Sequence, residues 1–268
     1  MSININQRWA LAIEYDGTFY HGWQRQTSPE QLTVQQVLET ALSAIANRNI
    51  SVVCAGRTDS GVHALGQVIH FDTHVARNAE AWVLGTNRYL PPGVRVLWAK
   101  PVACNFHARY SAIARRYLYL INTHPIRPAL LHNRVTWHRK PLNIEAMQEA
   151  AKYLLGEHDF SAYRAADCQA KSPVRRITHL HVRQTDKQTI ALDVQANAFL
   201  HHMVRNISGV LMKIGVGERP PEWAETVLHS RDRKQGGITA PPEGLYLHSV
   251  VYSEDFFGDF FNDSFLVC

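Results

Sequence analysis

Hydrophobic and polar positions alternate in the first clearly patterned stretch of the chain. Residues 9–15, WALAIEY, place large apolar side chains at every second position and end at Asp16-Gly17. A period of two that ends in a turn pair predicts a half-buried strand. In residues 33–46 the apolar positions instead recur every three or four residues, behind Thr33 as a candidate N-cap. This second pattern predicts an amphipathic helix.

The rest of the chain also contains both the strand-type and the helix-type spacing of apolar residues. Asp186-Lys187 separates two short apolar runs and indicates a hairpin. Mixed strands and helices with hairpin-type links favour an α+β fold, with mostly antiparallel strands and helices on one face. The further predicted strands are residues 51–55, 67–71, 94–102, 115–122, 179–183, 189–195 and 245–251, and the further predicted helices are residues 78–89, 143–155, 199–214 and 221–228.

The order of elements in the first part of the chain is followed by a similar series in the second. A length of 268 residues allows one large domain or two medium ones. No low-complexity linker interrupts the chain, so we expect two α+β halves, 1–105 and 106–252, that share a central sheet with a basic cleft between them. Residues 253–268 form an acidic, aromatic tail of unknown role.

Composition narrows the cellular setting. No apolar run approaches the roughly 20 residues of a membrane helix, and the first residues lack the pattern of a secretory signal. The four cysteines are far apart and form no CxxC pair, which argues against a disulfide framework or a structural zinc site. We therefore expect a cytoplasmic protein.

Charge is distributed unevenly along the chain. The net charge is +5, yet residues 81–144 contain ten Lys and Arg and no Asp or Glu, which leaves 18 basic and 23 acidic residues elsewhere. Such segregation produces a positive field that attracts a polyanion, and it favours nucleic acid as the partner. A basic surface without function is the alternative.

The segment 54–64, CAGRTDSGVHA, places one carboxylate on a Gly-flanked loop between two predicted strands. A loop held by two strands presents a reactive group rigidly, which makes Asp59 a candidate catalytic residue. The alternative is an ordinary turn in which Asp59 bonds its own backbone. Arg57, two residues earlier, is a candidate for insertion into a nucleic-acid stack or for a phosphate contact. A local Arg–Asp surface pair is equally consistent with the sequence.

Residues 106–120, FHARYSAIARRYLYL, combine aromatic and basic side chains. His107 and Arg109 fall on a predicted loop, and alternation places Arg115, Tyr117 and Tyr119 on one face of the following strand. A phenol ring among arginines is a stacking platform for an unstacked base. Tyrosine is also a common strand residue, so this segment alone leaves both readings open.

Residues 197–215 predict a largely buried helix that carries Arg205 away from its main apolar stripe. A guanidinium on such a helix requires a carboxylate or phosphate partner. Asp59 is a suitable partner, because an adjacent Arg keeps an Asp ionised. The competing carboxylates are Glu14, Asp193 and Glu243.

The sequence gives no pattern for a metal or cofactor. His179, His181, His201 and His202 have no third ligand at zincin-like spacing, and HExxH is absent. No Walker loop or dinucleotide-type GxGxxG is present either. We expect no metal and no cofactor.

Five ordered segments resemble the tRNA pseudouridine synthases of the TruA type, over about residues 8–252. The Asp59 loop matches in the stretch CAGRTDSGVHALGQVIHFDT. The other four segments are EYDGTFYHGWQRQ, FHARYSAIARRYLYLI, NAFLHHMVRNISGVLMKIG and APPEGLYL.

The resemblance implies a pseudouridine synthase fold, with two related halves, a mostly antiparallel central sheet, outer helices and an RNA-binding cleft. It also implies a homodimer that binds tRNA and isomerises uridines at positions 38, 39 and 40 of the anticodon stem-loop. This reaction needs no cofactor.

The resemblance also assigns roles to individual residues. Asp59 matches the catalytic aspartate and nucleophile, and Tyr117 matches a tyrosine packed against the target uracil. Arg205 matches the basic partner of the catalytic carboxylate. Arg57 matches a base-flipping residue, while Arg77 and Arg109 match tRNA-contacting arginines. Residues 167–171, Pro125 and the tail depart from the family pattern, which affects individual RNA contacts.

Two other functions compete with this one. A non-catalytic RNA-binding or RNA-chaperone protein would keep the charge pattern and tolerate loss of the Asp59 carboxylate. A glycosidase would need a second carboxylate about 5 to 9 Å away as proton donor, a role for Glu14 or Glu243. The glycosidase does not account for the acid-free basic segment.

Overall fold

The computed structural model describes residues 7–26 and 31–257, which fall into two compact units. Unit 1 comprises the described residues of Met1–Ile113 and His248–Cys268, and unit 2 is Ala114–Leu247. The chain passes between the units inside two strands, so the last strand returns to unit 1. That residues 1–105 and 106–252 form two related halves stays a prediction.

Unit 1 is built on an antiparallel sheet. β1 (Gln7–Tyr15) pairs with β3 (His63–Thr73) on one side and with β4 (Val94–Val102) on the other, in a register that sets Leu11 opposite Ile69. The short β2 (Val53–Cys54) also pairs with β3. This places the segment between β2 and β3, which carries Asp59, beside the end of β1.

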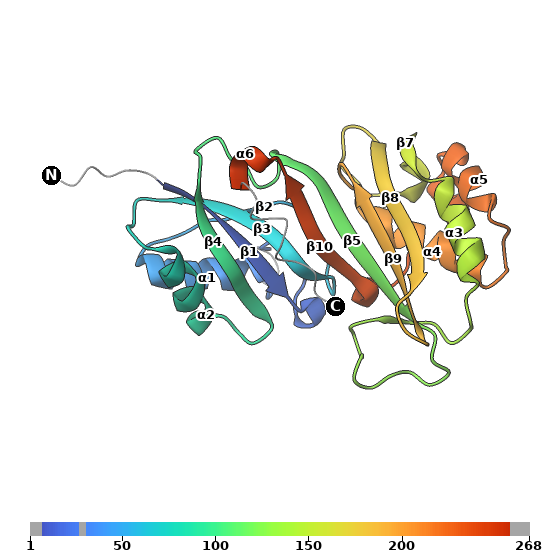
Figure 1. The fold of residues 1–268 in the computed structure, drawn as a ribbon, viewed down its shortest axis with the longest axis horizontal. Helices are drawn as coiled ribbons and strands as arrows, with labels where there is room; N and C mark the ends of the chain where they lie inside the picture. The colour runs from blue at the N-terminus through green and yellow to red at the C-terminus, as the bar shows by residue number, and fades with distance from the viewer. Residues whose placement is uncertain (1–6, 27–30, 258–268) are drawn as a thin grey trace. The chain divides into compact units, whose positions relative to one another are not determined.

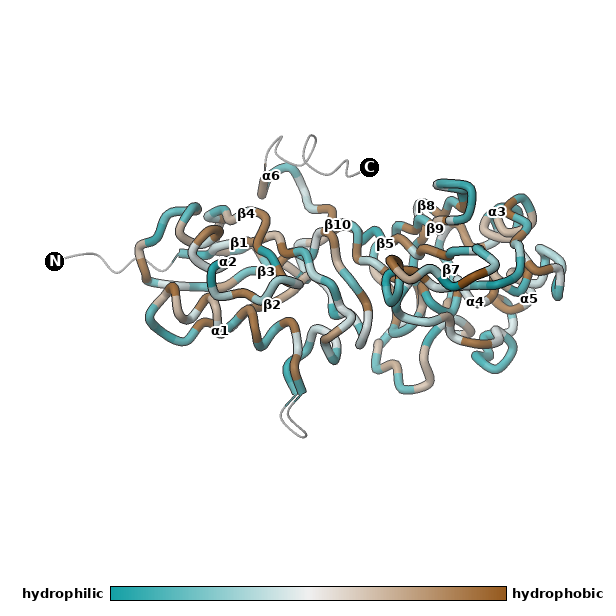
Figure 2. Tube along the Cα trace, turned by 90° about the horizontal axis from the view of Figure 1, so that it is seen from below, coloured by the Kyte–Doolittle hydropathy of each residue, from teal (hydrophilic) through white to brown (hydrophobic). Residues whose placement is uncertain are grey.

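One face of the unit 1 sheet is covered by α1 (Val34–Ala46), as Figures 1 and 2 show. The hydroxyl of Thr33 accepts the N–H of Gln36 and caps this helix. Leu38 and Leu42 are fully buried. A π-helical turn (Ala81–Gly85) and α2 (Thr86–Tyr89) follow later in the chain. Trp82 in this turn is buried against the rings of Trp9 and Phe71.

The C-terminal segment completes unit 1. β10 (Leu245–Tyr252) lies next to β3 and is followed by α6 (Glu254–Phe257). The ring of Phe257 packs against Trp98, Phe106 and Tyr252 at centroid distances of 5.6, 5.3 and 5.4 Å. The first residues of the predicted tail thus belong to the aromatic core of unit 1, and residues 258–268 lie outside the described part.

Unit 2 contains a second antiparallel series of strands with helices beside it (Figure 1). The strands run in the order β5 (Ala112–Asn122), β9 (Thr189–Ala196), β8 (Val174–Gln184) and β7 (Gly156–Asp159), and β6 (Thr136–Trp137) pairs in parallel with the end of β5. The helices are α3 (Ile144–Lys152), α4 (Met203–Gly215) and α5 (Trp223–Ser230). Short 3-10 segments span Gly17–Phe19 in unit 1 and Ser161–Tyr163, Arg233–Gly236 and Pro242–Gly244 in unit 2.

The expected α+β class, with mostly antiparallel strands and outer helices, is confirmed within each unit. The predicted strand 94–102 and the helix capped by Thr33 appear with almost the predicted bounds. The helix predicted from residue 199 begins only at Met203, because His202 has a φ of 60°. That left-handed conformation interrupts a right-handed helix. Within the described residues, no helix has both the length and the apolarity needed to cross a membrane.

Candidate active site and RNA-contacting loops

The Asp59 loop is held by the chain segment that follows β1. The N–H of Trp23 donates to the carbonyl oxygen of Thr58 at 3.0 Å, and the hydroxyls of Tyr15 and Thr58 are 2.7 Å apart. On the other side of Asp59, the carbonyl oxygen of Tyr20 accepts the Ser60 hydroxyl at 3.3 Å. The backbone is therefore fixed immediately before and immediately after the half-buried Asp59.

Two glycines allow this segment to approach the loop closely. Gly22 has a φ of 83°, and a Cβ on it would lie 2.8 Å from the carbonyl oxygen of Thr58. A Cβ on Gly17 would lie 2.1 Å from the carbonyl oxygen of Val62. Only glycine fits both sites, which explains the sequence DGTFYHGW in physical terms.

Gln67 fixes the start of the loop from inside the sheet. This fully buried side chain donates from Nε2 to the carbonyl oxygen of Gly56 at 2.6 Å and accepts the Gly56 N–H at 3.3 Å. Arg57 follows directly and is exposed. Arg57 thus extends to solvent from a backbone that is anchored on both sides.

The charges of Arg57 and Arg109 both affect the pKa of the Cys54 thiol. Burial raises the pKa of Cys54 to about 12, and the positive charges of Arg57 and Arg109 both oppose this rise. His70, which pairs with β2, accepts the N–H of Ala108 at 3.1 Å, so the loop of Arg109 lies beside the strand that leads into the Asp59 loop. Unit 1 therefore brings two of the predicted RNA-contacting arginines toward the start of the Asp59 loop.

Arg77, the third predicted RNA-contacting arginine, lies at a different place in unit 1. Its guanidinium donates to the carbonyl oxygens of Ile45 at 3.3 Å and Ala76 at 3.2 Å. Ile45 belongs to the last turn of α1, where a cation is favoured by the helix dipole. Arg77 is exposed there.

Tyr117 and Arg205 belong to unit 2. The ring of Tyr117, on β5, is buried and meets the ring of Phe199 edge-on, with centroids 5.0 Å apart. Arg205, on α4, donates from Nε to the carbonyl oxygen of Ala240 at 2.8 Å. Burial raises the pKa of Tyr119, and the charge of Arg205 opposes this rise. The hydroxyl of Tyr119 donates to the carbonyl oxygen of Pro241 at 2.9 Å, so Arg205 and Tyr119 bind two consecutive carbonyl groups.

Asp193 has a basic partner on the opposite side of β5. Arg116 donates from Nε to its carboxylate at 2.7 Å and also donates from Nη2. The Asp193 side chain is buried, so this two-point ion pair satisfies a carboxylate that competed as a partner for Arg205.

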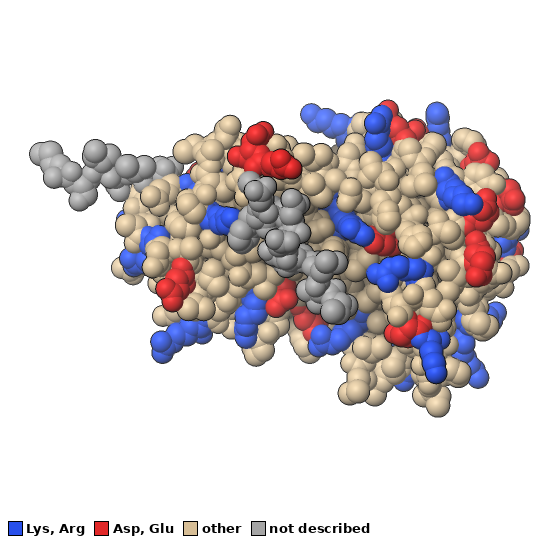
Figure 3. All heavy atoms as spheres, viewed as in Figure 1, with Lys and Arg blue, Asp and Glu red and all other residues tan. Residues whose placement is uncertain are grey.

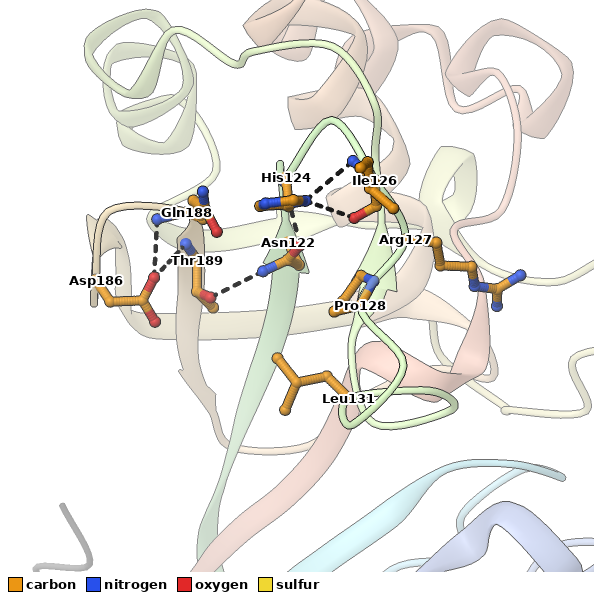
Figure 4. Close-up of a pocket in the computed structure, with 9 residues that line it drawn as sticks. All are labelled: Asn122, His124, Ile126, Arg127, Pro128, Leu131, Asp186, Gln188 and Thr189. Atoms are coloured by element: carbon orange, nitrogen blue, oxygen red, sulfur yellow. Dashed lines mark hydrogen bonds between the residues drawn. The ribbon is translucent and has the colours of Figure 1, made fainter.

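A pocket in unit 2 contains none of the predicted site residues (Figure 4). Its volume is about 470 Å³, and it lies between the end of β5 and the turn between β8 and β9. The carboxylate of Asp186 accepts the N–H groups of Gln188 at 2.8 Å and Thr189 at 2.9 Å, and Arg127 points away from the other labelled side chains. The polar groups of this pocket hold its own loops, and no substrate role follows from them.

The charged side chains do not form a single basic field on the face shown in Figure 3. Lys and Arg there are interspersed with Asp and Glu over the described residues. The uneven charge along the sequence is therefore not visible as one patch from this side.

Several residues that fix the loops were not predicted as functional. Tyr15 and Gln67 hold the Asp59 loop through their side chains, and Gly22 lets the neighbouring backbone approach it; these contacts have no sequence signature beyond the glycine pair in DGTFYHGW. Regularly placed glycines among aromatic residues are the one sign that another backbone passes close by.

Comparison with known proteins places these features in a family. The model of a tRNA pseudouridine synthase family matches residues 11–111 and 150–253. The chain is 54% identical over 249 residues to tRNA pseudouridine synthase A of Coxiella burnetii (strain Dugway 5J108-111), covering 93% of this chain and 94% of that protein. It is 55% identical over 249 residues to the protein of the same name from Pseudomonas aeruginosa, covering 93% and 87%.

A third relative is tRNA pseudouridine synthase A of Nitrosococcus oceani, 56% identical over 250 residues, with coverage of 93% of this chain and 95% of that protein. The matched residues include the Asp59 loop, the glycine-containing segment that holds it and the loop of Arg109. The chain belongs to the tRNA pseudouridine synthase family, the isomerases that convert uridine in tRNA to pseudouridine.

Proposed function

We propose that the protein isomerises uridines 38, 39 and 40 of the tRNA anticodon stem-loop, with Asp59 as the nucleophile acting on a flipped base. The observation that carries this proposal is the fixed backbone on both sides of Asp59, since a nucleophile must be held in a reactive geometry. The three positions rest on the resemblance of the sequence to synthases of the TruA type.

The reaction rearranges one nucleotide without a change in composition. The N1–C1′ bond of uridine breaks, the uracil turns, C5 bonds to C1′, and the proton of C5 is lost while N1 gains one. No electrons enter or leave, so no redox cofactor is required. Asp59 attacks C1′ or C6, or it removes a proton from the sugar and a glycal forms.

The target base must leave its stack before Asp59 can reach it. Extrusion costs a few kcal/mol. Arg57, exposed two residues before Asp59, fills the vacated space, while Arg77 and Arg109 bind phosphates. Tyr117 packs on the uracil and Arg205 keeps the catalytic carboxylate ionised, as the resemblance implies.

The proposal also covers the oligomeric state and the cellular compartment of the enzyme. It acts as a homodimer, in the cytoplasm, where its tRNA substrates are found. The resemblance supports the homodimer, and the cysteine usage supports the cytoplasm.

The positions are tested with tRNA transcripts that keep a single uridine at 38, 39 or 40 and none at the other two. Pseudouridine is mapped by carbodiimide labelling and primer extension after incubation with the purified protein. We expect conversion in all three transcripts and none in a transcript that lacks uridine at these positions. Conversion at another position in this last transcript, together with no conversion at 38, 39 or 40 in the other three, contradicts the proposal.

A further inference from the structure

An exposed aromatic ring stands on the loop that carries Arg109. Tyr110 belongs to unit 1 and is 77% exposed. Its ring is stacked on that of His107, with centroids 4.3 Å apart and planes inclined by 30°. The guanidinium carbon of Arg109 lies 5.7 Å from the centre of the Tyr110 ring. Most of the Tyr110 side chain therefore faces solvent and contributes little to the core.

The turn that carries this ring is fixed from within. Nδ1 of His107 accepts the N–H groups of Arg109 and Tyr110, both at 3.2 Å. The hydroxyl of Ser111 accepts the N–H of His107 at 2.9 Å, and the N–H of Ser111 donates to the carbonyl oxygen of His107, also at 2.9 Å. The ring of His107 is thus both the support of Tyr110 and the acceptor that closes the turn.

A second set of contacts anchors the same loop to the sheet. Buried His70, on β3, accepts the N–H of Ala108 at 3.1 Å, and Tyr252, on β10, donates to the Ala108 carbonyl oxygen at 2.7 Å. Arg8, on β1, donates to the carbonyl oxygens of Cys104 and Phe106, each at 2.7 Å. Three strands therefore hold the loop, while its aromatic ring is left to solvent.

We propose that Tyr110, supported by His107 and flanked by Arg109, is a stacking platform for an unpaired base of the tRNA substrate. A rigid exposed ring beside a guanidinium offers a π face and a phosphate-binding charge at one place. His70 accepts the Ala108 N–H and pairs with β2, so the platform lies beside the strand that leads into the Asp59 loop. This inference rests on the proposed function.

A purely structural role of Tyr110 predicts a loss of stability on truncation. A platform predicts a loss of RNA affinity instead, because most of the ring is exposed and its hydroxyl is not needed for stacking. Tyr110→Phe keeps the ring, and Tyr110→Ala removes it. Tyr89→Ala is the matched control, because Tyr89 is 60% exposed in the same unit and has no ring partner among the described residues.

The first test measures the Kd of full-length tRNA and the urea midpoint of unfolding for each variant. Tyr110→Ala is expected to weaken binding about 5- to 150-fold, the range for loss of one stacked base. Tyr110→Phe and Tyr89→Ala bind as the unchanged protein does, and all three variants unfold at its midpoint. An unchanged Kd for Tyr110→Ala, or a loss of affinity shared by Tyr110→Phe, overturns the proposal.

The second test identifies the stacked base. Anticodon stem-loops with one abasic site at each unpaired position are bound to the unchanged protein and to Tyr110→Ala. At one position the abasic site weakens binding to the unchanged protein but not to Tyr110→Ala. If the abasic site and Tyr110→Ala weaken binding by independent factors at every position, the result contradicts stacking. Failure of the unchanged protein to convert tRNA uridine refutes the proposed function separately, since stacking is measured by binding.

Discussion

The buried side chain of His70 holds the loop that carries the exposed ring of Tyr110. It accepts the N–H of Ala108 through Nδ1, and its ring lies 4.8 Å from that of His107. Burial, reinforced by the neighbouring Arg8 and His107 and opposed by the Asp72 carboxylate, lowers the pKa of His70 from 6.5 to about 4. The neutral ring is the form that accepts this hydrogen bond, so His70 supports the Tyr110 loop as long as it stays unprotonated.

This pKa predicts a pH dependence of stability. Between pH 6.5 and 4 the unfolded chain binds a proton at His70 that the folded protein does not, so the free energy of unfolding falls as the pH falls through this window. His70→Asn keeps an acceptor at the position of Nδ1 and removes the titration. We expect a shallower loss of stability for His70→Asn, measured by urea unfolding at several pH values. Equal pH slopes for the two proteins contradict this role.

Gly22 lets the neighbouring backbone approach the residue immediately before Asp59. Gly22→Ala combines a positive φ with a Cβ 2.8 Å from the carbonyl oxygen of Thr58. We expect kcat to fall on the order of 100-fold, because small displacements of reacting groups cost this much. Gly93→Ala is the control, since its Cβ would meet no atom closer than 3.7 Å. Equal kcat values for the two variants in steady-state assays refute the prediction.

At the residue scale, the sequence predicts the candidate functional residues better than the residues that hold them in place. Asp59 and Arg57 stand out from a Gly-flanked loop, and the N-cap Thr33 from its place before a periodic run. His70 and Gln67 look like ordinary members of a strand. Their importance comes from backbone groups far away in the sequence, which no local pattern specifies.

At the element scale, period and turn residues predict most helices and strands. The C-terminal end is different: residues 254–257 carry two phenylalanines among acidic residues, a pattern without a regular period. The helix α6 forms there because Phe257 is buried against three rings of unit 1. Tertiary packing, which a sequence pattern of four residues cannot reveal, determines this element.

Phe257→Ala tests this packing. Removal of a buried Phe costs about 3 to 5 kcal/mol, through lost burial and the cavity that remains. We expect a loss of free energy of unfolding of about that size in urea denaturation. Phe19→Ala, at a 76% exposed position, is expected to change it by less than about 0.5 kcal/mol. Equal effects of the two substitutions show that Phe257 contributes no core packing.

At the scale of the whole molecule, the sequence predicts an α+β class and a polyanionic partner. It does not show that the chain returns to unit 1 at its C-terminus, because strand neighbours separated by many residues follow from tertiary packing. The distribution of charge in space is also not given by its distribution along the chain, as the mixed face in Figure 3 illustrates.

Binding of tRNA is predicted to depend steeply on salt, because phosphate contacts release counterions. Arg109→Ala, in the acid-free segment, is expected to reduce the slope of log K against log[salt] by about 1. Arg48→Ala is the control, as it removes an exposed arginine of unit 1 outside that segment. Binding titrations of tRNA at several salt concentrations measure both slopes. A slope unchanged by Arg109→Ala argues against a phosphate contact.

The central claim is that the Asp59 carboxylate performs the isomerisation. Its most direct test is tritium release from tRNA labelled with [5-³H]uridine, because the C5 hydrogen is lost only when C5 bonds to C1′. The unchanged protein is predicted to release tritium, and Asp59→Asn is predicted to release none while binding tRNA with the same Kd. Release by Asp59→Asn at the rate of the unchanged protein contradicts the account and removes Asp59 from the chemistry.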